Sequence, residues 1–310
     1  MNRPATLPLG VDIGTVRTRI ALAERDAAGR PRLVAVATRP TGDDAAAAIA
    51  AARSELRTRE RRCVLALAAP DALLRRASFP TMGRSERERA ARFEAARFIA
   101  YPPHEATVRL AAAGGGYVLG IARSAALERR TAAARRAGLR PIAVDDAAFA
   151  LARAFPYADA IVDAGASATR LVVPGEPVPA VRHLPIGGAA ITAAIVASLG
   201  LHEAAAEARK QSIGLAGAGE HARDALVEEL TGLLVEQRAA SRAEIRTIAL
   251  AGNGARLAGL GAALERAVAI PVRLAALAAD ACDGLPADVV RAASPDWGLA
   301  YGLALWGDAA

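Results

Sequence analysis

The chain is poor in the residues that form covalent cross-links and large aromatic contacts. Aromatic residues make up 4% of its 310 residues, and its only cysteines are Cys63 and Cys282. Two cysteines cannot build the multiple bridges of a small disulfide-rich fold, and no CxxC spacing offers a zinc site. We therefore expect Cys63, which opens the apolar segment 63–69, to be a buried thiol in a fold that depends on its apolar core.

Lysine is almost absent, although the chain is basic. Lys210 is the one lysine among 39 Lys plus Arg residues, and the formal net charge is +7. Such uniform use of arginine is typical of a coding bias, so the charge says little about partners. Segment 84–97 intersperses its arginines with Glu86, Glu88 and Glu94, as a solvated helix face does. Because no zinc-finger, helix-turn-helix or RNA-binding motif accompanies the charge, the sequence does not indicate nucleic-acid binding.

Long hydrophobic runs are also lacking. No continuous apolar run precedes Asp12, as a signal peptide would require. The uncharged stretch 184–201 is rich in alanine and interrupted by Pro185, Gly187 and Gly188, so its insertion into a membrane would be poorly favoured. We expect a turn and a buried helix there, and a soluble cytoplasmic chain.

Two similar halves organise the sequence. Asp12-x-Gly14-Thr15 lies between two strand-like segments near the N-terminus, and Asp163-x-Gly165-x-x-x-Thr169 lies between two more, half a chain away. This repeat predicts a duplicated α/β fold with a cleft between the copies. The expected strands are 9–13, 19–24, 32–37, 63–67, 107–113, 117–122, 141–144, 160–162, 169–173 and 247–250. The expected helices are 45–61, one capped by Ser85 and Glu88, 124–137, 145–155, 189–199, 202–211, 223–238, 260–268 and 297–306.

The two turns carry residues that suit phosphate groups. A glycine-rich hairpin turn directs backbone N–H groups at an anion, and the missing Cβ allows the anion to approach. An aspartate would repel phosphate, so Asp12 and Asp163 are expected to hold hydrated Mg²⁺ through its water molecules. One such turn alone is more simply interpreted as an ordinary hairpin. Two of them facing each other indicate a clamp for the β- and γ-phosphates of a nucleotide.

Two further segments could complete such a site. Segment 250–255 contains Gly252-Asn253-Gly254 after a strand, and its bare backbone could contact a base or ribose. Glu207 and Lys210 lie three residues apart on an expected helix and so share one face. A surface ion pair is the simpler interpretation of that pair. However, the only lysine of the chain indicates a position that requires a compact ammonium group.

These segments resemble the actin-like ATPases and, among them, the PilM family of type IV pilus assembly proteins, which is similar to the cell-division protein FtsA. The similarity runs nearly end to end and is most specific over residues 137–154, which include Val144-Asp145. Other segments resemble the two phosphate loops (10–15 and 162–167), the inserted small subdomain (79–80 and 94–99), the strand and turn after the second loop (184–188 with Thr192), the nucleoside-contacting helix (206–210) and the adenosine loop (250–260).

The resemblance implies a two-lobed actin-like fold of the duplicated ribonuclease-H-like class. Lobe I would span residues 1–157 with an inserted small subdomain near 76–141, and lobe II would span 158–310, with a helix at 296–307 that returns to lobe I. ATP and Mg²⁺ would bind in the cleft, with Asp12 and Asp163 at the metal and Asp145 and Asp163 as catalytic carboxylates. The cofactor-binding residues would be Asp12, Gly14, Thr15, Arg19, Asp163, Gly165, Ser167, Thr169, Glu207, Lys210, Gly252, Asn253 and Gly254.

The resemblance also implies a cytoplasmic adaptor that is recruited to the inner-membrane face. It would dock the cytosolic tail of a PilN-like membrane protein as an extended peptide in the small subdomain, with self-association left open. Arg19 stands where the family usually has a lysine, and Val16 and Arg17 are bulky, which favours ATP binding with at most slow hydrolysis. One alternative is the actin-like component of a type II secretion system, which is ranked second because it carries a membrane anchor and this chain ends at Ala310 without one. The other is a small-molecule kinase, for which the segment 142–149 is too apolar to recognise a sugar.

Overall fold

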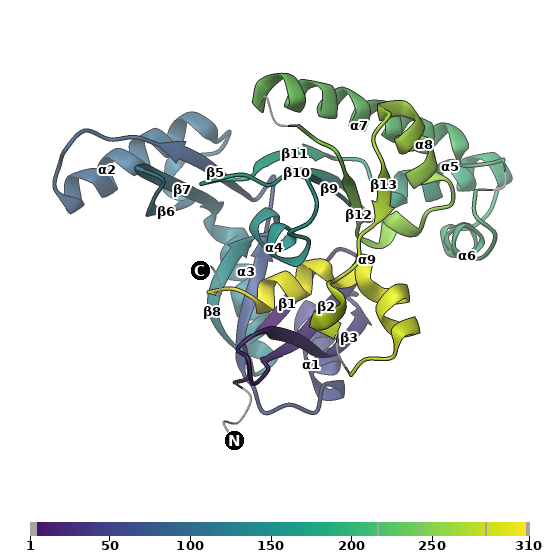
Figure 1. The fold of residues 1–310 in the computed structure, drawn as a ribbon, viewed down its shortest axis with the longest axis horizontal. Helices are drawn as coiled ribbons and strands as arrows, with labels where there is room; N and C mark the ends of the chain where they lie inside the picture. Colours follow the sequence, from purple (N-terminus) through teal and green to yellow (C-terminus); the bar gives the residue numbers. More distant parts are fainter. Residues whose placement is uncertain (1–4, 216, 242–243, 283, 308–310) are drawn as a thin grey trace.

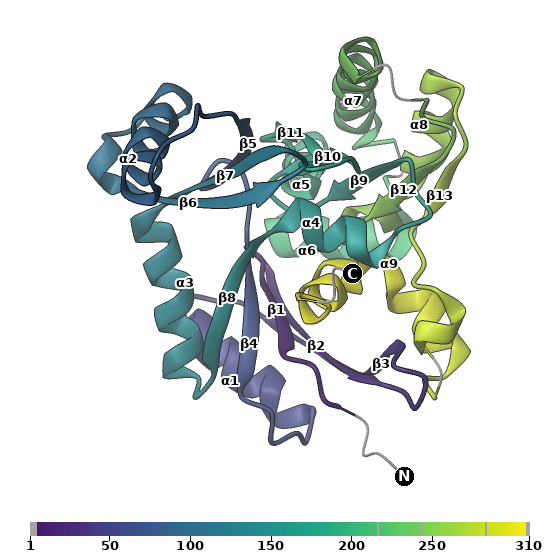
Figure 2. The same ribbon diagram turned by 60° about the vertical axis from the view of Figure 1, so that its left-hand side comes forward.

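The computed structural model describes residues 5–215, 217–241, 244–282 and 284–307. Within these residues the strands form two five-stranded sheets and one three-stranded sheet. Helices α4 (Ala147–Ala154) and α9 (Ala287–Ala304) lie between the two large sheets, and the small sheet projects to one side (Figures 1 and 2). The architecture confirms the two-lobed α/β fold expected from the sequence.

The first large sheet has the strand order β3-β2-β1-β4-β8. Alternate residues of a strand point to opposite faces. Leu9 and Val11 of β1 pack into a cluster with residues of α1 and α3, whereas Gly10 lies against α9. Asp12 shares the face of Gly10 and is therefore directed toward the space between the large sheets. The elements of this half are β1 (Leu9–Ile13), β2 (Arg17–Arg25), β3 (Pro31–Pro40), α1 (Ala45–Glu55), β4 (Arg62–Leu67), α3 (Ser124–Arg136) and β8 (Arg140–Asp146).

The second large sheet repeats this plan, with the order β11-β10-β9-β12-β13. In both sheets the central strand pairs antiparallel with the strand that follows it and parallel with its other neighbour. Ala160 and Val162 of β9 pack into a cluster with α7 and α8, while Ile161 belongs to the cluster between the sheets, and Asp163 shares its face. The elements of this half are β9 (Ala160–Ala164), β10 (Thr169–Val173), β11 (Ala180–Leu184), α5 (Gly188–Leu199), α6 (Glu203–Ile213), α7 (Glu220–Ser241), β12 (Ile248–Ala251), α8 (Leu260–Val268) and β13 (Val272–Leu274).

The small sheet has the order β5-β7-β6, and α2 covers one of its faces. The expected hairpin through the three glycines is confirmed, but the predicted cap at Ser85 is wrong. The N-cap is Gly83, two residues before the predicted one, and it provides no side-chain cap. The guanidinium of Arg76 donates to the carbonyl of Glu176, so this sheet contacts the second half of the chain. Its elements are β5 (Ala72–Ala77), α2 (Arg84–Ala95), β6 (Ala106–Ala113) and β7 (Gly116–Arg123), and short 3-10 turns lie at Ala96–Phe98, Pro103–Glu105, Asn253–Arg256 and Ala279–Cys282.

The uncharged stretch at 184–201 contains the end of β11, a turn and all of α5, with Ile191 and Ile195 buried, as expected. In the parts of the chain that the structure describes, no single helix is long and apolar enough to cross a membrane. Helices α5 and α6 reach that length and composition only as a pair, and they are bent by 106° at their junction.

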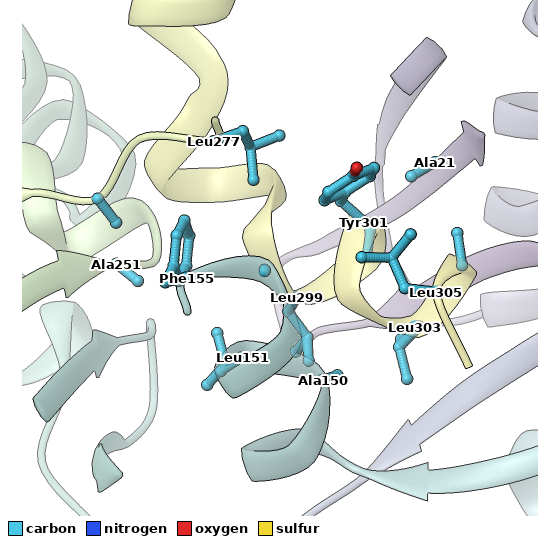
Figure 3. Packing of buried hydrophobic residues seen from close by; sticks show 14 of the residues in the cluster. Ala21, Ala150, Leu151, Phe155, Ala251, Leu277, Leu299, Tyr301, Leu303 and Leu305 are labelled. Carbon is cyan, nitrogen blue, oxygen red and sulfur yellow. The ribbon is translucent and has the colours of Figure 1, made fainter. Parts of the chain in front are cut away.

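The core between the large sheets joins the two halves (Figure 3). It includes Ala21 of β2, Ala251 of β12 and residues of α4 and α9. Glycines allow the close approach here: a Cβ on Gly302 would lie 1.8 Å from the carbonyl oxygen of Ala150, and one on Gly10 would lie 1.8 Å from that of Ala300. Helix α9 therefore packs directly on α4 and β1. The lobe and subdomain boundaries stated above stay predictions.

Candidate functional site

Each large sheet contributes one hairpin to the space between them, and the two hairpins share more than the Asp-x-Gly motif. Both read Asp-x-Gly-x-x-x-Thr-Arg, whereas the repeat predicted from the sequence extends only to Thr15 in the first copy and Thr169 in the second. In the first hairpin Asp12 stands opposite Arg19 across the strands, and in the second Asp163 stands opposite Arg170. Each aspartate is therefore placed beside an arginine of its own hairpin.

The two turns have the same backbone geometry. The amide of Gly14 donates to the carbonyl of Arg17 at 3.0 Å, and that of Gly165 donates to the carbonyl of Ala168 at 2.9 Å. A Cβ on Gly14 would lie 2.7 Å from the Arg17 oxygen, and one on Gly165 would lie 2.9 Å from the Ala168 oxygen, so both turns require glycine. Thr15 and Ser167, which were expected to bind the cofactor, lie exposed at the tips of these turns.

A buried threonine anchors the far side of each turn. The hydroxyl of Thr18 lies 3.1 Å from that of Thr41, which in turn donates to the Gly14 carbonyl at 2.8 Å. The hydroxyl of Thr169 donates to the Ile186 carbonyl at 2.8 Å. Thr169 is fully buried, and its hydrogen bond stabilises the turn. Its side chain is therefore not available to contact a ligand directly.

The hairpins approach each other closely enough for their charges to interact. Burial raises the pKa of Asp12, the guanidiniums of Arg19 and Arg170 oppose this rise, and the carboxylate of Asp163 adds to it. The side chains of Asp12 and Asp163 are 15% and 7% exposed. The structure therefore brings together these two aspartates, as predicted from the repeat, and surrounds them with arginines.

The carboxylates do not fit the magnesium ion that the sequence led us to expect. Both Nε and Nη2 of Arg170 donate to Oδ2 of Asp163, at 3.0 and 2.6 Å. Oδ1 of Asp163 lies under Gly252, where a Cβ would be only 2.6 Å away. Mg²⁺ keeps an octahedral shell of oxygen ligands, several of them water. Because Arg170 binds Oδ2 of Asp163 and the guanidinium of Arg19 lies 3.7 Å from Oδ2 of Asp12, we derive no chemistry through a metal here.

Asp145 and Asp146 end β8, and they have different partners. Asp145, expected to be catalytic, forms an ion pair with Arg153, whose Nε also donates to the Gly302 carbonyl at 3.0 Å. Asp146 accepts a hydrogen bond of 2.8 Å from the amide of Ala148 and so caps α4. Burial raises the pKa of Asp146 to about 6, with Asp145 adding to the rise and Arg170 opposing it. The charge of Asp146 therefore interacts with Arg170 of the second hairpin.

The loop Gly252-Asn253-Gly254 packs on the second hairpin. Gly252 has φ +78°, and its Cβ would lie 2.4 Å from the Ala164 carbonyl oxygen, while a Cβ on Gly254 would lie 2.8 Å from the Cβ of Ala164. The glycines are therefore needed for close contact with β9, whether or not a base also packs here. Asn253 lies exposed between them.

Glu207 and Lys210 belong to a network that joins α6 to the start of α5. The ammonium of Lys210 donates to the Gly188 carbonyl at 2.9 Å and to the Thr192 hydroxyl at 2.6 Å, and it lies 2.6 Å from Glu207. The Gly188 amide in turn donates to the Gly165 carbonyl at 3.0 Å. The Lys210 side chain is only 10% exposed. The only lysine of the chain is thus connected, through Gly188, to the glycine turn of the second hairpin.

The comparison with protein families decides the family. A sequence model of the type IV pilus assembly protein PilM matches residues 10–307. The chain belongs to the PilM family. No match was found among curated protein sequences.

Solved structures agree with the PilM family assignment. One described as the PilM–PilN type IV pilus biogenesis complex is 28% identical, with a TM-score of 0.84 over 97% of this chain and 98% of that one. The ethanolamine utilization protein EutJ from Carboxydothermus hydrogenoformans is 16% identical, with a TM-score of 0.62 over 99% of this chain and 91% of that one. The MamK double helical filament is 13% identical, with a TM-score of 0.58 over 98% and 99%. The last two show a shared fold alone.

Sequence reasoning on this PilM-family chain missed two residues of the site, Arg130 and Arg170. Arg170 could have been found, because it occupies the same place in the second motif as Arg19 does in the first. Asp146 was not distinguished from Asp145. Arg130 of α3 gave no signal, yet its Nη1 donates to the Ile13 carbonyl at 2.9 Å, and its charge lowers the pKa of Asp12, which burial raises.

Proposed function

We propose that the chain is a nucleotide-binding adaptor of type IV pilus assembly that works at the cytoplasmic face of the inner membrane. ATP would bind between the two large sheets, and the cytosolic tail of a PilN-like membrane protein would dock on the small sheet. The observation that carries the proposal is the pair of facing hairpins in a member of the PilM family.

The hairpins support phosphate binding through shape and charge. Each offers an exposed turn held by glycine, and the guanidiniums of Arg19, Arg130 and Arg170 gather beside them. Guanidinium groups bind phosphate oxygens through paired, charge-assisted hydrogen bonds. A polyphosphate chain lying between the turns would meet both hairpins at once, so a nucleotide would bridge the two halves of the molecule.

The surroundings of the β8 carboxylates favour binding with at most slow hydrolysis. A general base must be free to accept a proton from the attacking water. Asp145 is held by Arg153, and Asp146 accepts the capping bond of α4. Neither is placed as a free base, and for the same reason we do not favour a small-molecule kinase.

The nucleotide proposal can be tested by titrating the protein with a fluorescent ATP analogue. We expect saturable binding that Thr15→Glu and Ser167→Glu each weaken by about tenfold or more, because each adds a negative charge at an exposed turn tip. Ser54→Glu adds the same charge at an exposed position on α1 and should bind as the wild type does. Failure of the wild type to bind refutes the nucleotide proposal. Unchanged affinity in both turn variants shows that the nucleotide binds elsewhere.

The partner proposal is supported by the solved complex of PilM with PilN, which matches this chain over nearly its whole length. The small sheet exposes apolar surface that its own core does not use. Phe93 on α2 is 80% exposed and Phe98, just after the helix, is 36% exposed, with Arg75 packed over its ring. Exposed aromatic side chains are enriched in protein interfaces. We propose Phe93 as an anchor for the tail peptide.

A pull-down with a synthetic N-terminal peptide of a PilN-like protein tests this proposal separately. We expect the peptide to capture the wild-type protein and to capture much less of the Phe93→Ser variant. Val235 on α7 is 60% exposed and belongs to the second half of the chain, so Val235→Ser serves as the matched control and should be retained. No capture of the wild type refutes the partner, and full capture of Phe93→Ser moves the docking site off α2.

A further inference from the structure

Arg170 lies between the two hairpins, and none of the sequence motifs predicted a role for it. It lies on β10 directly opposite Asp163 of β9 and donates two hydrogen bonds, of 3.0 and 2.6 Å, to one carboxylate oxygen. These bonds use two of its three guanidinium nitrogens. A guanidinium carries five N–H donors in a rigid fork, so donors on Nη1 are directed away from this carboxylate.

The charge of Arg170 reaches both halves of the molecule. Besides Asp163, it faces Asp12 of the first hairpin and Asp146 at the end of β8, and the three carboxylates together raise the pKa of Arg170 although burial opposes this. Its side chain is 22% exposed, so one part of the group still meets the solvent side of the site. A fixed cation thus stands among the acidic side chains of both hairpins.

The negative charge of Asp12 is also compensated by arginines. Asp12 lies 3.7 Å from Arg19 and also interacts with Arg130. The carboxylates that would orient a hydrated divalent cation are therefore compensated by arginines of the chain itself.

From this arrangement we propose that Arg170 acts as a built-in counter-cation and that the site binds nucleotide phosphates without a divalent metal. The proposal rests on the nucleotide-binding function proposed above. Arginine is suited to the role because it stays charged when buried and binds carboxylate and phosphate with the same planar fork. It would neutralise Asp163 on one side and contact a phosphate oxygen on the other.

The test compares binding of the fluorescent ATP analogue in excess EDTA and in Mg²⁺. We expect wild-type affinity to change by less than about threefold between the two conditions, because no metal ion contributes to the contact. Arg170→Ala should bind at least about tenfold more weakly in EDTA and recover part of that loss in Mg²⁺, because the ion can then reach Asp163. Arg170→Lys keeps the charge and should stay independent of Mg²⁺.

Arg182 provides the matched control, because it lies in the same sheet on β11 and is also partly buried. Arg182→Ala should behave as the wild type does in both conditions. If Arg170→Ala no longer unfolds cooperatively on heating, the Mg²⁺ dependence of binding by the wild type and by Arg170→Lys tests the counter-cation role instead.

The outcomes separate the two proposals. Wild-type binding that requires Mg²⁺ overturns the counter-cation role and leaves nucleotide binding intact. Binding of Arg170→Ala that is as strong as that of the wild type in EDTA overturns it too. No wild-type binding in either condition refutes the function on which it rests.

Discussion

The contact between α9 and α4 allows a sharp prediction about stability. Gly302 is buried, and a Cβ at this position would lie 1.8 Å from the carbonyl oxygen and 2.5 Å from the carbonyl carbon of Ala150. Both are backbone atoms of the facing helix, so no side-chain rotation can relieve the overlap. In Gly302→Ala the two helices would have to separate, which would disturb the cluster between the sheets (Figure 3).

The size of the effect follows from two opposing contributions. Overpacking a well-packed core typically costs about 1–3 kcal/mol, and an overlap as severe as this one belongs at the upper end. Alanine is better than glycine within a helix by about 1 kcal/mol. We therefore expect Gly302→Ala to lower the free energy of unfolding by about 2 kcal/mol or more.

Gly232 is the matched control, because it lies exposed within α7 and a Cβ there meets nothing within 4 Å. Gly232→Ala should raise the unfolding free energy by up to about 1 kcal/mol through helix propensity alone. Urea denaturation followed by circular dichroism measures both variants. Equal stability of Gly302→Ala and Gly232→Ala would refute the packing of α9 on α4 described here.

Three further predictions concern single residues. Because burial raises the pKa of Asp146 to about 6, the folded chain binds more protons than the unfolded chain between its ordinary value of 3.8 and that pH. The contribution of this group to the free energy of unfolding therefore falls by up to about 3 kcal/mol as the pH rises through this window. Asp146→Asn, which can still cap α4, should remove this pH dependence. Denaturation curves taken at several pH values measure it. Lys210→Arg should destabilise the protein by about 1 kcal/mol or more, because a planar guanidinium cannot reproduce three close contacts around one ammonium. Arg266→Lys, on the exposed side of α8, is the control and should change the stability little. Thermal melts of the two variants measure the difference. Burial raises the pKa of Cys63 to about 12, so in a Cys282→Ala background its thiol should react with a disulfide reagent only as fast as the protein opens, and rapid reaction in the folded state would contradict its burial.

The sequence was sufficient for the fold because the duplication is visible in its motifs. Both hairpins and the central strands β1 and β9 could be predicted, since glycine at a tight turn and apolar strands on either side leave few alternatives. Strands β5, β11 and β13 were missed. Each lies at the edge of its sheet, and most of its residues are only partly buried, so its apolar pattern is weak.

The site was predictable only in part, because side-chain partners depend on tertiary contacts. The repeat correctly indicated that Asp12 and Asp163 come together. It did not show that each faces an arginine, although Arg19 and Arg170 occupy equivalent places in the two motifs. Adjacent residues at the end of a strand point in different directions, so the pattern alone could not separate Asp145 from Asp146.

Hydrogen–deuterium exchange with and without ATP, in excess EDTA, tests the central claim most directly. If the two hairpins form one phosphate site, exchange should slow together in the turn residues 14–18 and 165–169 when the nucleotide binds. Bound nucleotide that protects only one turn, or neither, would contradict a shared site between the two halves of the chain.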